Sequence, residues 1–232
     1  MSVEFEYALC DHKDVREYVK ANHYSRTCPS AISHSFSITA NGKLRGAAQF
    51  AYTAGAQSTG SIFKFPYGAK EHSRELARLV LDDDLPRNSE SRFVGWILRY
   101  LKSHSGIKGL LSYADPERGH DGIIYRASNW LYTGRSRVGS RLIIDGKELH
   151  TRQVSAIYGT CSVKALRAQG LNVEVRITPP KHRYVYLLDS TLLVFVKYPI
   201  VPFVIMLLCL AARRARKYVR KLAKFKEEQH ER

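Results

Sequence analysis

The fold of this chain is decided by the stretch Gly109-Leu-Leu-Ser-Tyr113-Ala-Asp115-Pro-Glu-Arg-Gly-His120-Asp-Gly122-Ile-Ile-Tyr125. Its first five residues are typical of a buried strand, and the Pro after Asp115 ends the strand because it lacks a backbone N–H. The part from Asp121 to Trp130 indicates a short helix. A polar residue directly after a central strand projects into the crevice where α/β sheets bind ligands. The stretch therefore predicts a strand-loop-helix unit with Asp115 and Tyr125 at a functional centre.

Upstream of this unit, the clearest element is a β-hairpin. Two strand-like runs, Ser35–Thr39 and Lys43–Phe50, flank Asn41-Gly42. Both residues of such a turn must accept positive φ, which Asn and Gly do most easily. The remaining upstream elements are a strand over Val3–Ala8, a helix over Asp11–Ala21, a buried strand over Glu75–Leu81 and a helix from Asn88 or Ser89 to Ser103.

A second hairpin, a helix and a strand pair follow the central unit. The hairpin covers Arg141–His150 and turns at Asp145-Gly146, the helix lies near Ser162–Gln169, and the strand pair ends at Tyr184–Leu188. Hairpin strands followed by strand-helix units predict a mixed sheet covered by helices, which is an α/β fold. We therefore expect one domain over residues 1–203, with the second hairpin and its helix as an insertion, and a basic extension over residues 204–232.

The composition narrows the classes of partner. The apolar fraction of 44% excludes wholesale disorder, and 37 Lys and Arg against 21 Asp and Glu give a net charge of +16. Such an excess favours a polyanion, which means nucleic acid, an anionic membrane or a phosphorylated cofactor. The four cysteines have no paired spacing, which indicates reduced intracellular thiols. With no secretory signal in residues 1–20, we expect a cytoplasmic protein, associated with the nucleoid of a host cell.

The apolar stretch Ser190–Ala212 and the basic run after it resemble a membrane anchor. Lys197 lies inside the stretch, and Pro199 and Pro202 interrupt its middle. We therefore expect no stable membrane span, but a terminal strand over Leu192–Val196, a turn, and a basic amphipathic helix after it.

Polar and cationic residues surround the start of the helix at residue 89. In acyl-CoA-dependent N-acyltransferases, a helix N-terminus at this place receives the pyrophosphate of the cofactor through free backbone N–H groups. Here this segment lacks the Gly-rich run that is usual in those enzymes. The residues expected to bind the cofactor are Arg78, Arg87, Asn88, Ser89 and Ser91.

The element Gly122–Gly134 resembles the part of the acetyltransferase (GNAT) family in which a helical Tyr serves as the general acid. Further motifs resemble the Mom family of phage DNA-modification proteins over roughly residues 4–203. They are Asn22-His-Tyr-Ser25, Glu75-Leu-Ala-Arg78, Pro86-Arg-Asn-Ser-Glu-Ser91, Ser112-Tyr-Ala-Asp115, Ile124-Tyr-Arg-Ala-Ser-Asn-Trp130 and Lys181-His-Arg-Tyr-Val-Tyr186. The resemblance implies a GNAT-like fold and an enzyme that converts adenine in duplex DNA to an N6-carbamoylmethyl derivative, which shields phage DNA from host restriction.

Carried over position by position, the resemblance implies the catalytic residues His23, Tyr24, Asp115 and Tyr125. It also implies a metal, namely iron, for which His23, Asp115 and Tyr125 are suitable ligand types, and an acyl-CoA-like donor. From chemistry alone, Asp115 is the candidate to take the proton of the adenine amine, and His120 or His23 could act as a base or a ligand.

The basic residues that we expect to contact DNA phosphates lie in and around the second hairpin, at Arg135, Arg137, Arg141, Lys181 and Arg183. A hairpin is narrow enough to enter a groove. The neighbouring aromatic residues Trp130, Tyr132, Tyr158 and Tyr184 are candidates to stack on a flipped adenine. The expected partners are double-stranded DNA and a second copy of the chain, in a homodimer.

Two other functions are compatible with the sequence. One is an ordinary N-acetyltransferase acting on a small amine or a protein, which would bind acetyl-CoA tightly and leave the mass of adenine nucleosides unchanged. The other is a non-enzymatic, membrane-tethered protein that binds nucleic acid, which would need detergent for release.

Overall fold

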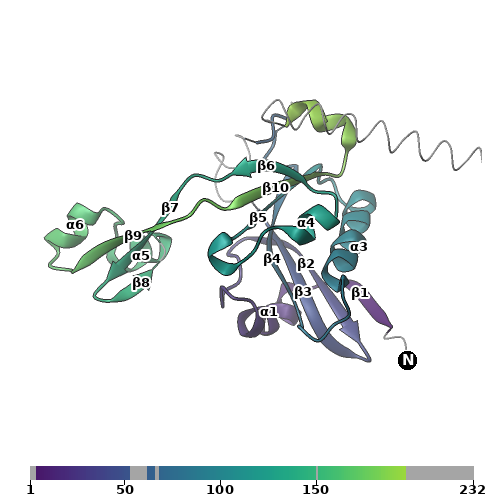
Figure 1. Ribbon diagram of the computed structural model, residues 1–232, viewed down its shortest axis with the longest axis horizontal. Helices are drawn as coiled ribbons and strands as arrows, with labels where there is room; N and C mark the ends of the chain where they lie inside the picture. Colours follow the sequence, from purple (N-terminus) through teal and green to yellow (C-terminus); the bar gives the residue numbers. More distant parts are fainter. Residues whose placement is uncertain (1–3, 53–61, 66–67, 150, 197–232) are drawn as a thin grey trace, which may run out of the picture.

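The computed structural model describes residues 4–52, 62–65, 68–149 and 151–196, and Figure 1 shows a large sheet with a smaller unit projecting from it. The large sheet has the strand order β1-β2-β3-β4-β5-β10-β6. Only the β4/β5 pair is parallel. The strands are β1 (Phe5–Cys10), β2 (Ile32–Ala40), β3 (Lys43–Ala51), β4 (Ser73–Leu81), β5 (Gly109–Ala114), β6 (Leu131–Arg135) and β10 (His182–Leu187). The predicted α/β fold, a mixed sheet covered by helices, is confirmed.

Helices cover both faces of this sheet. Ala47 and Ala48 are neighbours on β3 and therefore point to opposite faces. Ala47 packs against Val15 and Val19 of helix α1 (His12–Asn22), whereas Ala48 belongs to the core under helix α3 (Ser89–His104). Helix α1 begins after Asp11, which forms a capping box with Asp14, and the predicted helix start is confirmed. The short elements are α4 (Ile123–Ala127) and the 3₁₀ turns η1 (Pro116–Arg118) and η2 (Ser190–Phe195).

The parallel strands β4 and β5 pair only at their beginnings. Their paired residues run from Ser73↔Gly109 to Glu75↔Leu111, although β4 continues to Leu81 and β5 to Ala114. On the other edge of β4, the register with β3 shifts so that Ala77 is an extra residue, a β-bulge. Side chains donate hydrogen bonds to backbone carbonyls in this part of β4. Ser112 Oγ donates to the Leu76 carbonyl, and Arg78 donates to the Ala77 carbonyl. A wedge therefore opens between the ends of β4 and β5.

The smaller unit, residues 137–180, is called the arm. It contains the sheet β8-β7-β9, with strands β7 (Gly139–Ile144), β8 (Lys147–Leu149) and β9 (Val173–Thr178), and the helices α5 (Thr151–Tyr158) and α6 (Val163–Ala168). Six residues form its separate core: Leu142, Ile144, Leu149, Val154, Leu166 and Val173. The chain leaves the body after Ser136 and returns to it at Lys181. The two residues are neighbours, because the Ser136 N–H donates to the Lys181 carbonyl at 2.8 Å.

Both predicted hairpins are confirmed, and each turn has the expected backbone. The φ angles are 52° at Asn41, 72° at Gly42, 49° at Asp145 and 79° at Gly146. This region of φ is disfavoured for residues other than Gly, Asn and Asp.

Two predictions need correction, and two elements were missed. The strands predicted as a pair before Leu188 do not pair with each other, because β9 joins β7 in the arm while β10 inserts between β5 and β6. The strand predicted over Leu192–Val196 is mainly the turn η2, which Asp189 starts by accepting the Thr191 N–H, and only Val196 forms a β-bridge, with Phe63. Strand β6 and helix α5 were not predicted.

Much of the predicted tail falls outside the described residues. This applies to the extension over 204–232, the amphipathic helix and the stretch from Lys197 to Ala212. In the part of the chain that the structure describes, no helix is both long and apolar enough to cross a membrane.

Candidate active site

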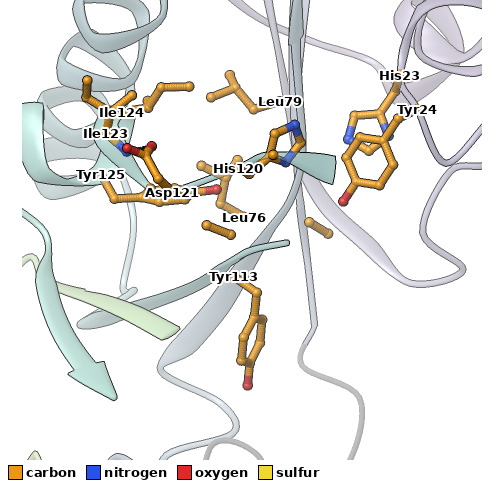
Figure 2. Close-up of a pocket in the computed structure, with 14 residues that line it drawn as sticks. His23, Tyr24, Leu76, Leu79, Tyr113, His120, Asp121, Ile123, Ile124 and Tyr125 are labelled. Carbon is orange, nitrogen blue, oxygen red and sulfur yellow. Dashed lines mark hydrogen bonds between the residues drawn. The ribbon is translucent and has the colours of Figure 1, made fainter. Parts of the chain in front are cut away.

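A cavity of about 250 Å³ lies at the wedge between β4 and β5 (Figure 2). Figure 2 shows His23 and Tyr24 on one side of the cavity, Tyr125 on the other, and His120 between them. The lining residues are His23, Tyr24, Leu76, Ala77, Leu79, Tyr113, Ala114, Gly119, His120, Asp121, Gly122, Ile123, Ile124 and Tyr125. The structure therefore brings together three of the four predicted catalytic residues.

His23 directly follows helix α1 and is only 5% exposed. Its Nδ1 atom accepts the Ser25 backbone N–H at 3.1 Å and lies 2.8 Å from Ser25 Oγ. A backbone N–H can only donate, so Nδ1 is the acceptor and the ring proton of neutral His23 is on Nε2. Burial first, and then the charges of Arg78 and His120, lower the pKa of His23 to about 4. His23 is therefore a neutral hydrogen-bond donor at neutral pH.

Tyr24 forms the mouth of the cavity, with 42% of its surface exposed. Its ring centroid lies 4.2 Å from that of His23 and 5.3 Å from that of His120, and the guanidinium carbon of Arg118 lies 5.6 Å from it. His120 is held by its backbone N–H, which donates to the Asp115 carbonyl at 3.1 Å. The mouth is thus an aromatic surface bordered by a cation.

Tyr125 contributes the hydroxyl on the opposite wall. The Tyr125 hydroxyl lies 2.8 Å from Ser112 Oγ, and burial raises the pKa of Tyr125 to about 12. Its ring packs between Trp130 and Tyr184, with centroid distances of 5.3 and 5.0 Å. Tyr184 approaches Gly122 so closely that a Cβ there would collide with its ring, and Gly122 also has φ +77°. Tyr125 is therefore a rigidly held, protonated acid.

Asp115, the fourth predicted catalytic residue, does not line the cavity, although Ala114 beside it does. One carboxylate oxygen lies 2.7 Å from Lys181 Nζ, and the other accepts the Glu117 N–H at 3.1 Å, which starts the turn η1. Burial alone would raise the pKa of Asp115, but the hydrogen bond and charge of Lys181 hold it below its usual range. The carboxylate therefore shapes the loop that carries His120.

The predicted iron ligands His23, Asp115 and Tyr125 do not fit a metal site. Both carboxylate oxygens of Asp115 have protein partners, and the cavity-side nitrogen of His23 carries a proton. A metal needs the unprotonated lone pair of an imidazole. Within the described residues, no group of three or more His, Cys, Asp or Glu side chains could hold a metal ion.

Most of the predicted cofactor residues serve the fold. Arg78 donates to the Thr27 carbonyl at 2.7 Å and so ties the loop after Tyr24 to strand β4. Ser89 Oγ donates to the Pro86 carbonyl at 2.6 Å, and Ser91 Oγ donates to the Asn88 carbonyl at 3.0 Å. Asn88 stands at the N-cap of α3 without a side-chain capping bond, and Arg87 is exposed.

The predicted DNA contacts divide into two groups. Arg135 and Arg137 are exposed at the root of the arm, and Arg141 on β7 is half-buried. Lys181 pairs with Asp115, and Arg183 donates to the Thr133 hydroxyl at 3.0 Å and to its carbonyl at 2.8 Å. Among the aromatic candidates, Trp130 and Tyr184 belong to the core, whereas Tyr132 is 41% exposed.

Two residues of the site were not singled out by the sequence. Ser112 is buried and contacts Tyr125, and Ser25 fixes the tautomer of His23. A polar residue inside an apolar strand was the available signal for Ser112, because a buried hydroxyl requires a partner.

The comparisons with known proteins agree in one family. A model of the Mom protein family matches residues 4–204. The methylcarbamoylase Mom of Escherichia phage Mu is 28% identical over 146 residues, which cover 61% of this chain and 58% of that protein. The chain thus matches less than two thirds of the length of this relative.

Solved N-acetyltransferases are also similar to the chain. A GNAT family enzyme from Escherichia coli, solved in complex with CoA, has a TM-score of 0.47 and 11% identity, covering 85% of this chain and 89% of that one. An acetyltransferase from Salmonella typhimurium, solved with acetyl-CoA, has a TM-score of 0.47 and 11% identity, covering 80% and 94%.

Proposed function

Because the chain belongs to the Mom protein family, we propose that it is a transferase that converts adenine in duplex DNA to its N6-carbamoylmethyl derivative. One observation carries this proposal. The cavity combines an imidazole donor at His23, a protonated phenol at Tyr125 and an exposed aromatic mouth at Tyr24. An enzyme that modifies a base outside the stack needs such a set of polar groups behind an aromatic surface. The proposed place of action is the cytoplasm of the host cell.

The reaction forms a bond between N6 of adenine and the methylene carbon of the donor. The bond from that carbon to its leaving group breaks, and N6 loses one proton. The N6 lone pair is delocalised into the ring, so removal of this proton must accompany the attack. His120 is the imidazole at the cavity whose position suits a base.

The other two groups act on the donor. Tyr125 gives a proton to the leaving group, since its raised pKa keeps it protonated until charge develops beside it. His23 donates through Nε2–H to the amide oxygen of the carbamoylmethyl group and orients it. Asp115 takes no proton in this scheme, and its role is to position the loop of His120.

DNA reaches the cavity from the side of the arm. The exposed Arg135 and Arg137 contact phosphates and set the register without reading sequence. A flipped adenine then stacks on Tyr24, with Arg118 beside the ring.

The test is expression of the chain in a bacterium, followed by mass spectrometry of the DNA nucleosides. We expect deoxyadenosine with an added carbamoylmethyl group, and loss of that species on the order of a hundredfold or more in Tyr125→Phe and in His120→Ala. Tyr100→Phe is the matched control, since Tyr100 lies on α3 outside the cavity. Unmodified deoxyadenosine from a folded protein, or full modification by Tyr125→Phe, would contradict the proposal.

A further inference from the structure

A groove leads from the outside of the molecule into the candidate active site. It lies between the end of α1, the end of β4 and the start of α3, and it shares His23, Tyr24, Leu79, His120 and Ile124 with the cavity. A donor that enters the cavity from this side therefore passes the start of α3. This helix terminus is the place where a pyrophosphate was expected from the sequence.

The groove carries a strong negative charge. Among the residues that the structure describes, four acids line it, Asp82, Asp83, Asp84 and Glu90, and no Lys or Arg does. Arg45 pairs with both Asp82 and Asp84 and supplies one positive charge. Four negative charges and this one positive charge leave a formal net charge of −3.

Three of the five side chains expected to hold a pyrophosphate here are already in use. The Ser89 backbone N–H and the Ser89 hydroxyl both donate to the Pro86 carbonyl, and the Ser91 hydroxyl donates to the Asn88 carbonyl. Arg78 donates to Thr27 and Ala77. A phosphate in the groove would therefore meet four carboxylates while these side chains are engaged elsewhere, whereas anion sites offer free side-chain donors and cations.

From these contacts we infer that coenzyme A thioesters do not fit this groove and that the donor is a small, neutral or cationic molecule without phosphate groups. Asp83 and Glu90 are the specificity-determining residues, because Arg45 pairs only with the other two acids. Their carboxylates repel the phosphates of a nucleotide carrier and also keep the DNA backbone away from this side of the cavity.

The chemistry of the product supports the same conclusion, and this step rests on the proposed function. Attack of an amine on a thioester carbonyl forms an N–C(=O) bond and releases the thiol. In the carbamoylmethyl product, N6 is bonded to a methylene carbon. Acyl transfer from a thioester therefore does not give this connectivity, and a donor that delivers the methylene carbon is required.

The test compares two thioesters in a binding assay that does not depend on catalysis. Acetyl-CoA and S-acetylpantetheine share the acyl arm, but only acetyl-CoA carries the pyrophosphate and the 3′-phosphate. Dissociation constants are measured by calorimetry at low and high salt for the wild type and for Asp83→Asn/Glu90→Gln. Glu174→Gln is the control, since Glu174 is an exposed acid on the arm.

We expect the wild type to bind acetyl-CoA no more tightly than S-acetylpantetheine. The double variant should gain about tenfold or more for acetyl-CoA alone, and salt should reduce this gain because it screens exposed charges. Tighter binding of acetyl-CoA by the wild type, by tenfold or more, overturns the inference. An unchanged affinity in the double variant overturns the role of the two acids. Nucleoside mass spectrometry tests the DNA modification separately.

Discussion

Several half-buried cations of the body and the two cations at the root of the arm have different surroundings. In the body, Arg45 pairs with two aspartates, Arg78 donates to Thr27 and Arg183 donates to Thr133. At the root of the arm, the side chains of Arg135 and Arg137 are exposed. The net charge of +16 therefore does not indicate where a polyanion binds. Exposed cations lie at the root of the arm, and exposed arginines such as Arg87 occur on the body as well, whereas the lining of the groove is acidic.

The two regions also have separate cores. The main core of the body extends from Phe36 on β2 to Leu188, and it contains no residue of the arm. The arm has its own core of six buried residues. A contact between the regions is the ion-pair network of Arg176, whose guanidinium donates to Glu148 in the arm and to Glu117 in the loop after β5. The regions should therefore unfold as separate units.

Removal of the arm tests this comparison most strongly, because it is expected to change duplex affinity more than any other variant. In this variant, an Asn-Gly turn replaces residues 138–179, which the adjacent positions of Ser136 and Lys181 allow. We expect the body to fold with a melting temperature within a few degrees of the wild type. Duplex affinity should fall on the order of tenfold through loss of the cations of the arm, and on the order of a thousandfold when Arg135 and Arg137, which this variant keeps, are also replaced by Ser. Calorimetry and fluorescence anisotropy measure these quantities. A body that fails to fold would show that the two cores are not independent.

The stability of the protein should depend on pH through a group in the body, His23. The pKa of His23 is about 4 in the folded state, against an ordinary value of 6.5. The unfolded chain therefore takes up the proton first, so the contribution of His23 is complete above pH 6.5 and is lost as the pH falls toward 4. Between pH 7.5 and 4.5 we expect the free energy of unfolding to decrease by roughly 2–3 kcal/mol through His23.

Denaturant unfolding at the two pH values tests this prediction. His23→Gln should flatten the pH dependence by that amount, while the exposed His12→Gln should not. The armless variant should keep the dependence of the wild type. A flat profile in the armless variant would place the titrating group in the arm and reverse the comparison.

Disruption of the ion pairs of Arg176 should change the free energy of unfolding least. Its side chains are 29–43% exposed, so solvent screens the ion pairs. We expect a coupling of about 0.2–1 kcal/mol between Arg176 and Glu117 in a double-mutant cycle, and a similar value with Glu148. Hydrogen exchange supplies a second readout, because loss of the Glu117 pair should speed exchange in residues 116–121 without affecting α3. A coupling above about 2 kcal/mol would mean that the arm and the loop form one unit.

The elements that depend on local chemistry could be predicted from the sequence. Asn41-Gly42 and Asp145-Gly146 specify their turns because few other residues accept positive φ at both positions. The start of α1 at Asp11 is local as well, because its capping box lies within the first turn of the helix. The order of the last strands could not be predicted in this way, because β10 pairs with strands that lie about 50 and 70 residues before it in the chain.

The candidate active site could likewise be predicted only in part from the sequence. The resemblance indicated His23, Tyr24 and Tyr125, and these residues line one cavity. The surroundings that decide their chemistry depend on distant contacts. Lys181, which pairs with the carboxylate of Asp115, lies 66 positions after it in the chain. The acids between β4 and α3 and Glu90 line a groove that exists only in the folded chain. Residue types therefore identified the participants, whereas their charge states and partners required the structure.

The hydrogen-bonded neighbours Ser136 and Lys181 have a consequence for how this molecule could be altered. Everything between them is a closed loop, and lengthening such a loop costs closure entropy that grows only with the logarithm of its length. The body therefore tolerates inserted modules of very different size at this point. Exchange of residues 138–179 for an unrelated small module should therefore leave the fold of the body and the residues of the cavity in place.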